Sequence, residues 1–314
     1  MPSPPTPAAP FRLGTRRSPL AMAQAEEARA RLCAAHGWGA DAVELVPVLA
    51  SGDKIQDRAL ADIGGKALWT RELDRWLVEG RIDGAVHSLK DVETVRPDTL
   101  AIGAVLPRAD KADVLIGAAS IAALPQGATV GTSAPRRAAQ LLHRRPDCAV
   151  AVFRGNVATR LAKLAAGEVQ ATFLAAGGLA RLGEHGVGTR LDPEDWLPAP
   201  SQAAIGIECR AEDATARAVL AAIDHPPSRA EVAAERALLA ALGGSCHSAV
   251  ACLTRAEGAQ LRLTAAIFAL DGAERVAGDA AFAPGAHEPA AQALAADLLA
   301  RAPAAVRAAF HPPG

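Results

Sequence analysis

The chain has 314 residues, 50% of them hydrophobic, so it is long enough for two or three domains and can bury their cores. Its 33 lysines and arginines against 34 aspartates and glutamates give a net charge of −1, without the basic field that attracts nucleic acid or an anionic membrane. Aromatic residues make up 3%, with no tyrosine, so the stacking platforms that single-stranded nucleic acid needs are missing.

The start of the chain and the cysteines indicate a compartment. Residues 1–10 are proline-rich and have neither the basic nor the apolar segment of a signal peptide, so we expect a flexible tail there. No apolar run reaches membrane-spanning length. The five cysteines are odd in number and show no zinc-site spacing. These features predict a cytoplasmic protein without a disulfide framework or a metal site.

Strands and helices are expected to alternate through the first part of the chain. The expected strands are 11–13, 43–49, 82–86, 100–106 and 114–117. A helix should begin at Ser18-Pro19 and run to about Ala35, because serine is a good N-cap and proline fits the first helical position. A second helix is expected at 66–79. This alternation predicts a parallel-rich sheet covered by helices.

The pattern then restarts. Strands are expected at 129–131, 149–153 and 171–175. A helix should begin at 132–135, and two further helices should span 157–166 and 176–182. The turn-rich segment 192–201 predicts a crossover, followed by a strand at 204–209 and a helix at 213–223. We expect that strand to return to the first domain, which gives two hinged α/β lobes joined twice.

The last part of the chain has a different pattern. Residues 225–228 predict a linker, and a helix is expected at 231–242. Strands at 249–254, 260–270 and 274–282 follow, with a hairpin turn at Asp271-Gly272 and a final helix over about 289–309. The predicted division is therefore a tail (1–10), an α/β domain 1 (11–108 and 204–223), an α/β domain 2 (109–203) and a small α+β domain 3 (228–314).

The loop after the 231–242 helix carries one cysteine, Cys246. Gly243 and Gly244 end the helix, because glycine adopts the left-handed cap conformation without steric cost. A thiol on a short loop of small residues is open to a ligand. Taken alone, this cysteine fits a small, half-buried structural residue better than a reactive one. The rest of the chain makes it a candidate.

Arginines recur at three expected helix starts. They are Arg16 and Arg17 before Ser18, Arg136 and Arg137 after Ser133, and Arg154 and Arg160 around Gly155-Asn156. Helix N-termini attract anions, and a guanidinium binds carboxylate or phosphate bidentately. A single such arginine could be a solvated surface charge, but three repeats at strand-to-helix turns favour a polyanion site. Neither of the usual glycine-rich nucleotide motifs is present, which disfavours a nucleoside triphosphate.

Asp91 follows the 82–86 strand and is adjacent to Lys90. A carboxylate close to several cations should remain ionised. It could simply form a salt bridge with Lys90 or Arg16, or it could stabilise a cation formed in a reaction. His87 is expected to pack or form hydrogen bonds, because no nucleophilic serine motif accompanies it.

Several motifs together resemble the porphobilinogen deaminase (hydroxymethylbilane synthase) family, in the family's own order. They are RLGTRRSPLA at 12–21, GGK at 64–66, VHSLKDV at 86–92, GTS at 131–133 with Arg136-Arg137, RGNVATR at 154–160, GIECR at 206–210 and GSC at 244–246. Each motif alone is weak, but together they are specific and cover the chain from Arg12 to the third domain.

The resemblance implies two hinged, periplasmic-binding-protein-like α/β lobes plus a small C-terminal α+β domain. It also implies a transferase of tetrapyrrole (haem) biosynthesis. Such an enzyme condenses four porphobilinogens head to tail, releases ammonia at each step and frees hydroxymethylbilane. The family attaches a dipyrromethane cofactor to a loop cysteine, here Cys246, and its catalytic aspartate matches Asp91.

The matching binding residues follow from the same resemblance. Cofactor contacts would come from Lys90, Ser133, Arg136 and Arg137, and substrate contacts from Arg16, Ser18, Lys66, Arg154, Asn156, Arg160 and Gln202. The partners would be porphobilinogen and the growing oligopyrrole. We expect a monomer without nucleic acid, membrane or an obligate protein partner.

One departure and one alternative remain. Ser201-Gln202-Ala203 stands where the family usually has Gly-Gln-Gly, which bears on the hinge role of Gln202. The alternative function is a non-catalytic two-lobed protein that binds a small anion. The lobes and arginines fit it equally well, whereas the cysteine loop, the third domain and the missing export signal favour the enzyme.

Overall fold

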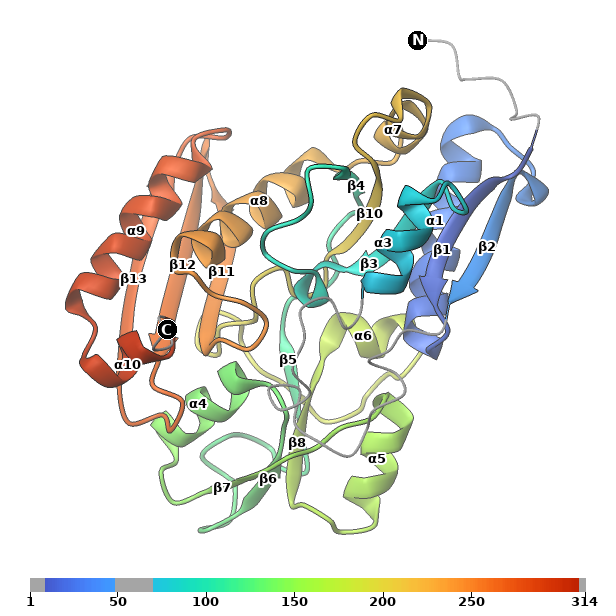
Figure 1. Ribbon diagram of the computed structural model, residues 1–314. Helices are drawn as coiled ribbons and strands as arrows, with labels where there is room; N and C mark the ends of the chain where they lie inside the picture. Colours follow the sequence, from blue (N-terminus) through green and yellow to red (C-terminus); the bar gives the residue numbers. More distant parts are fainter. Residues whose placement is uncertain (1–8, 49–69, 311–314) are drawn as a thin grey trace. The chain divides into compact units, whose positions relative to one another are not determined.

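The computed structural model describes residues 9–48 and 70–310 (Figure 1). These residues form a mixed α/β structure with three sheets. The described residues divide into two compact units, one containing 9–48, 70–109 and 203–229, the other 110–202 and 230–310. Lys66 and most of the expected tail lie outside the described residues.

The first unit is built on a five-stranded sheet with the order β2-β1-β3-β10-β4. The strands are β1 (Phe11–Arg16), β2 (Val43–Val48), β3 (Gly84–Ser88), β4 (Leu100–Val105) and β10 (Ile205–Arg210). β1 is parallel to β2 and β3, and β10 runs antiparallel to both β3 and β4. The expected return of the late strand to the first sheet is therefore confirmed.

The helices of this unit pack on that sheet. They are α1 (Pro19–His36), α3 (Arg71–Val78) and α7 (Ala214–Ala221), with short 3-10 turns at Ala40–Ala42 and Leu89–Asp91. The Ser18 side chain accepts a hydrogen bond from the amide of Ala21, and Gly37 ends α1 with φ 68°. The predicted cap and proline start of α1 are thus confirmed.

A second five-stranded sheet, with the order β7-β6-β8-β5-β9, lies in the second unit. Its elements are β5 (Asp113–Ile116), β6 (Thr129–Gly131), β7 (Ala149–Ala151), β8 (Ala171–Ala175), β9 (Thr189–Arg190), α4 (Pro135–Arg144), α5 (Val157–Ala165) and α6 (Ala176–Arg181). β6 is parallel to β7 and β8, whereas β5 is antiparallel to β8 and β9. The two sheets confirm the predicted pair of α/β lobes.

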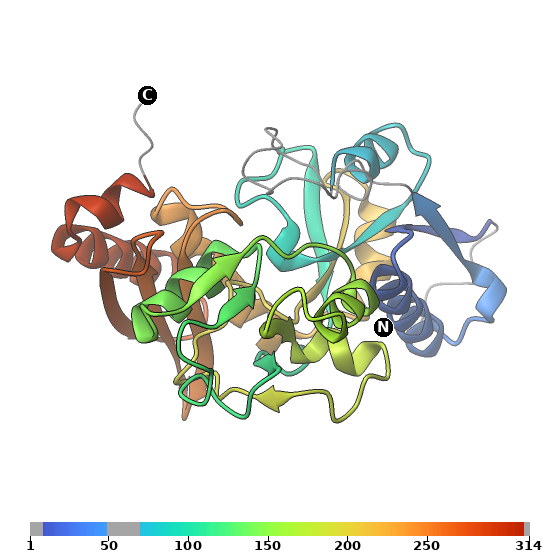
Figure 2. The ribbon, with the colours of Figure 1, turned by 90° about the horizontal axis from the view of Figure 1, so that it is seen from below.

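The C-terminal part is an antiparallel sheet of β11 (Val250–Glu257), β12 (Gln260–Phe268) and β13 (Arg275–Phe282) with helices α8 (Pro226–Ala241), α9 (His287–Arg301) and α10 (Ala304–Ala308). Figure 2 shows α9 lying along this sheet. Leu238 of α8, Leu263 of β12 and Leu298 of α9 belong to one buried cluster. The opposite face of the sheet packs through Phe268 against Ala139 of α4. This is the expected small α+β layer.

Two sequence expectations were wrong. The supposed linker 225–228 is the start of α8, because proline is compatible with a first helical turn, where its missing N–H leaves no intrahelical bond unmade. His225 Nδ1 lies 2.8 Å from Ser228 Oγ at this start. The final helix is also not continuous, since Ala302 is extended and Pro303 separates α9 from α10. No helix in the described ranges has the length and apolar character needed to cross a membrane.

Candidate active site

The turn that carries Asp91 is fixed by strand β10. The turn Leu89–Asp91 follows β3 directly, and the Leu89 amide donates to the carbonyl oxygen of Ala204 at 3.0 Å. The Leu89 side chain is buried over Gly206, where an added Cβ would lie 2.4 Å from Leu89 Cδ2. The glycine of the GIECR motif is therefore needed so that this turn can pack on the sheet.

A pocket in the first unit brings Asp91 together with one predicted arginine. It is lined by Arg16, Ala21, Gln24, Thr70, Val86, His87, Ser88, Asp91 and Val92. Gln24 of α1 donates to Ser88 Oγ at 2.8 Å, which connects the helix to the end of β3. Ser18 caps α1 next to Arg16, and Lys90 lies beside Asp91 on its turn. The pocket thus brings together Arg16 and Asp91, which come from the ends of different strands.

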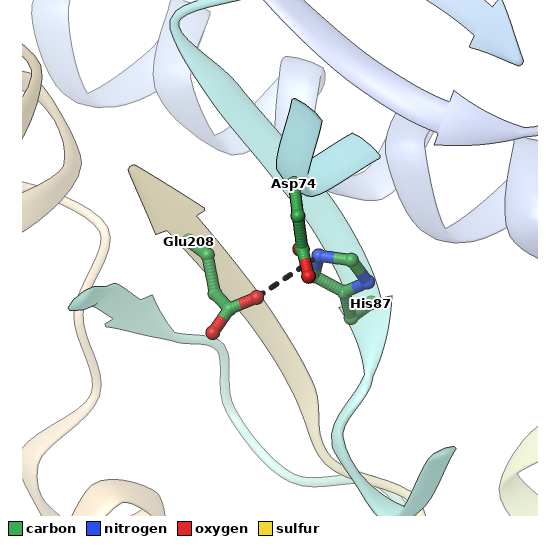
Figure 3. Close-up of side chains that lie close together, drawn as sticks. All are labelled: Asp74, His87 and Glu208. Atoms are coloured by element: carbon green, nitrogen blue, oxygen red, sulfur yellow. Dashed lines mark ion pairs between the residues drawn. The ribbon is translucent and has the colours of Figure 1, made fainter. Parts of the chain in front are cut away.

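A charged cluster next to this pocket was not predicted from the sequence. It contains Asp74, His87 and Glu208, whose possible metal-coordinating atoms lie within 4.8 Å of one another (Figure 3). His87 Nε2 is 3.2 Å from Glu208 Oε2. Arg96 donates to both Glu208 oxygens, at 2.9 and 2.8 Å, and to Asp74 at 2.6 Å. His87 is buried, which agrees with the packing role expected for it, but its Nε2 makes no hydrogen bond within the described residues.

The electrostatics of the cluster keep Glu208 ionised. Burial alone would raise the pKa of Glu208, but His87 and Arg96 together lower it to about 2. For Asp74, burial dominates and raises the pKa, while Arg96 offsets part of this effect. The Arg96 guanidinium pairs with both carboxylates of the cluster, so the protein itself supplies their counter-charge.

In the second unit, Arg136 and Arg137 surround a buried carboxylate. Arg136 Nη2 donates to Asp113 Oδ2 at 2.8 Å, and Arg137 Nη2 donates to Asp113 Oδ1 at 2.6 Å. The side chains of Trp196 and Gln202 donate to the same carboxylate, at 2.9 and 3.0 Å. Burial opposes ionisation, but the two guanidiniums hold the pKa of Asp113 far below its usual range. Asp113 was not predicted, because it lies within an apolar strand.

The remaining predicted anion contacts lie where two adjacent parallel strands, β6 and β7, end. Ser133 Oγ accepts a hydrogen bond from the amide of Phe153 at 3.0 Å. Asn156 caps α5 by accepting from the amide of Thr159 at 2.8 Å. Arg160 Nε donates to the carbonyl oxygen of Gly155 at 3.0 Å, and Arg154 is largely buried. Ligands commonly bind at this end of parallel strands in α/β proteins.

Cys246 is exposed, whereas Cys148, Cys209 and Cys252 are buried and Cys33 is partly buried. The loop follows Gly243, whose φ of 65° ends α8. The hydroxyl of Ser248 accepts from the amide of Ser245 at 3.0 Å, so the loop has a defined turn. All five cysteines lie in the described part of the chain, and Cys246 is the one among them that is classed as exposed. It therefore fits covalent attachment of a cofactor.

Gln202 lies in a strained segment. Ser201 and Ala203, on either side of it, have φ values of 61° and 66°, a left-handed conformation that favours glycine. Gln202 is buried and donates to the carbonyl oxygen of Lys111 at 2.7 Å. The glycines usual in the family would adopt this backbone without strain, so the departure seen in the sequence has a structural cost here.

The described residues thus form an α/β protein with two lobes, arginines near several strand ends and one exposed cysteine. Residues 11–218 match the family model described as porphobilinogen deaminase, dipyromethane cofactor binding domain, and residues 229–299 match the model of the porphobilinogen deaminase C-terminal domain. The chain belongs to the porphobilinogen deaminase family.

Curated relatives support this assignment over nearly the full length. Porphobilinogen deaminase of Sphingopyxis alaskensis is 57% identical over 97% of this chain and 98% of its own length. Porphobilinogen deaminase of Paracoccus denitrificans is 48% identical over 96% of this chain and 97% of its own. This membership favours an enzyme over the alternative of a non-catalytic anion-binding protein.

Proposed function

We propose that this chain is a hydroxymethylbilane synthase. As such it is a transferase that condenses four porphobilinogen molecules head to tail, with loss of ammonia at each step, in tetrapyrrole biosynthesis. The observation that carries the proposal is the pocket in which Arg16 and Asp91 occur together, in a chain of this family. Porphobilinogen carries carboxylates and loses an amine, so one cation to bind it and one anion to stabilise the developing positive charge are the groups needed.

Asp91 is the proposed catalytic residue. When the C–N bond of the aminomethyl group breaks and ammonia leaves, the methylene carbon and the pyrrole attached to it share a positive charge, and a fixed carboxylate stabilises that charge without reorganisation. The anchoring of Leu89 to β10 keeps the carboxylate in place before the substrate arrives. Arg16 of the same pocket binds a substrate carboxylate, with Ser18 and Lys66 as further predicted contacts. Lys90, next to Asp91, is assigned to the cofactor.

Cys246 is the proposed attachment point of the dipyrromethane cofactor, through a thioether. When bound, the cofactor supplies the pyrrole end to which each new unit is added. The cofactor and the growing chain both carry carboxylates that the protein must bind. The cofactor contacts are assigned to Ser133, Arg136 and Arg137. The substrate contacts of the second unit are assigned to Arg154, Asn156, Arg160 and Gln202. Asp113 fixes the guanidiniums of Arg136 and Arg137, which lowers the entropy lost when they bind an anion.

Intact mass spectrometry tests the cofactor assignment. Purified protein incubated with porphobilinogen should gain the mass of two condensed pyrroles, followed by a ladder of single-pyrrole additions. Cys246→Ala should remain at its bare mass, whereas Cys33→Ala, which removes a partly buried thiol, should behave like the wild type. A folded wild-type protein that keeps its bare mass and releases no ammonia would contradict the proposed function. An adduct on Cys246→Ala would contradict only the attachment site.

We also propose a cytoplasmic monomer that needs no nucleic acid, membrane or protein partner. The balanced charge supports the proposal that neither nucleic acid nor a membrane is bound, and the low aromatic content supports it for nucleic acid. No disulfide joins the five cysteines, all of which lie in the described ranges, as expected in a reducing compartment. Light scattering after size exclusion should give a mass close to 32.1 kDa, and a stable dimer mass would refute the monomer.

A further inference from the structure

The segment 87–96, which carries Asp91, is held at both ends by one buried carboxylate. Glu208 of β10 has no exposed surface. On one side its Oε2 lies 3.2 Å from His87 Nε2, just before the Asp91 turn. On the other side both of its oxygens accept from Arg96, which follows that turn, at 2.9 and 2.8 Å. A single side chain therefore closes the segment.

The register of the sheet explains why Glu208 can do this. Glu208 pairs with Ala85 across the β10–β3 ladder, and His87 lies two residues further along β3, on the same face. The Leu89 side chain packs against Gly206, two residues before Glu208 on β10. Successive contacts from β10 thus reach the segment before, within and after its turn.

We call the contacts of Glu208 with His87 and Arg96 the clamp. Arg96 connects this clamp to other elements. It donates to Asp74 of α3 at 2.6 Å and to Glu93, inside the segment itself, at 2.6 Å. The hydroxyl of Thr70, which lines the pocket, donates to Glu93 at 2.9 Å. The guanidinium occupies the space between Asp74 and Glu208, so it supplies the positive charge that a metal ion would otherwise bring to the cluster.

We propose that Glu208 is a positioning residue for Asp91: by binding His87 and Arg96 it fixes the geometry of the segment between them. This inference rests on the catalytic role proposed for Asp91. Its physical basis is that catalysis by a fixed charge depends on placement, and a displacement of about 1 Å can cost on the order of 10²-fold in rate. Glu208 itself touches neither substrate nor reacting atoms.

The test compares Glu208→Gln with wild type and with Asp224→Asn. Asp224 is a matched control, because it is a partly buried carboxylate of the same unit that accepts from the Val105 amide and from Arg229, each at 2.8 Å, away from segment 87–96. Glu208→Gln should lower kcat about tenfold or more, with KM within about threefold. Asp224→Asn should keep both constants within about twofold. Wild-type kcat in folded Glu208→Gln, or an equal fall in both variants, would overturn the proposal.

Amide hydrogen exchange gives a readout that does not depend on activity. In Glu208→Gln the amides of segment 87–96, including the Leu89 amide bonded to Ala204, should exchange about tenfold faster, while those of α1 stay as in wild type. Unchanged exchange in the segment would contradict the clamp. If Glu208→Gln does not fold, Arg96→Lys replaces it, since lysine keeps the charge but loses the two-pronged bond to Glu208. The same kcat and exchange criteria then apply.

A mutant cycle and one further variant separate the two proposals. If Glu208 acts through Arg96, Glu208→Gln combined with Arg96→Lys should lower kcat by clearly less than the product of the single effects. Multiplicative effects would place the two residues in independent roles and reject the clamp. Asp91→Asn is measured alongside. If it is nearly inactive while Glu208→Gln is fully active, only the positioning role fails. If Asp91→Asn is fully active, the catalytic assignment itself fails.

Discussion

Replacing Ser201 by glycine should make this protein more stable, which is the reverse of the usual effect of glycine. Ser201 has a φ of 61°, and a residue with a Cβ in this region costs roughly 1–2 kcal/mol. Its buried hydroxyl has no hydrogen-bond partner among the described residues, which adds about 1 kcal/mol. Against this, glycine adds about 0.5–1 kcal/mol of chain entropy to the unfolded state. We expect a net stabilisation of about 1 kcal/mol or slightly more.

The strain persists because its surroundings determine the backbone. The amide of Ser201 donates to the buried Glu235 Oε2 at 2.7 Å, and Glu235 Oε1 accepts from the amide of Thr254 at 3.0 Å. The first bond involves only the backbone of Ser201 and the second does not involve Ser201, so Ser201→Gly retains both. The substitution therefore removes the strained Cβ and the buried hydroxyl without removing an observed contact.

The assay is urea unfolding followed by circular dichroism, with the melting temperature as a second measure. The free energy of unfolding of Ser201→Gly should rise by about 1 kcal/mol and the melting temperature by about 2 °C. Ala296→Gly, at an exposed position inside α9, is the control and should lose about 1 kcal/mol. A loss of stability in Ser201→Gly similar to that of the control would refute the strain argument.

Four further outcomes are expected. Asp91→Asn should fold and carry cofactor but lower kcat about 10²-fold or more in a porphobilinogen turnover assay, and near-normal turnover would exclude its catalytic role. Asp113→Asn should lose about 3–5 kcal/mol in urea unfolding, because it leaves buried guanidiniums without their counter-charge; a loss below about 1 kcal/mol would contradict this. Gly206→Ala should lose about 1–3 kcal/mol through the clash with Leu89, and an unchanged urea midpoint would reject the close packing. Folding lowers the pKa of Glu208 to about 2, so ionised Glu208 contributes its full stabilising free energy at pH values above its pKa in the unfolded chain, about 4.5. This stabilisation is lost as pH falls from about 4.5 towards 2, so the urea midpoint should be lower at pH 3 than at pH 7, and equal midpoints would refute it.

Local signals in the sequence predicted local structure well. The Ser18-Pro19 start of α1 and the hairpin between β12 and β13 depend on residues adjacent in the chain, and both are confirmed. The errors at 225–228 and at Pro303 have one cause. The effect of a proline depends on its position relative to the helix start: Pro226 and Pro227 lie in the first turn of α8, where proline is tolerated, whereas Pro303 lies between α9 and α10, where it ends the helix.

The buried carboxylates could not be predicted, because their partners are distant in the sequence. Asp113 is held by arginines of α4, and Glu208 by His87 and Arg96. In the sequence both acids stand inside apolar strands and give no sign of a charged partner. Only the pairing of β10 with β3 brings Glu208 to the Asp91 segment, and that pairing depends on a chain that leaves the first lobe and returns.

Each lobe places one buried acid against arginine. A protein that binds a polyanion needs several cations close together, but neighbouring guanidiniums repel each other and lose hydration when buried. In the second unit, Asp113 bonds both Arg136 and Arg137, so two cations can be held with one opposing charge. In the first unit, Glu208 accepts from both prongs of Arg96. These bonds depend on the planar guanidinium of arginine. Replacing Arg96, Arg136 or Arg137 by lysine would therefore keep the positive charge but lose this hydrogen-bond geometry.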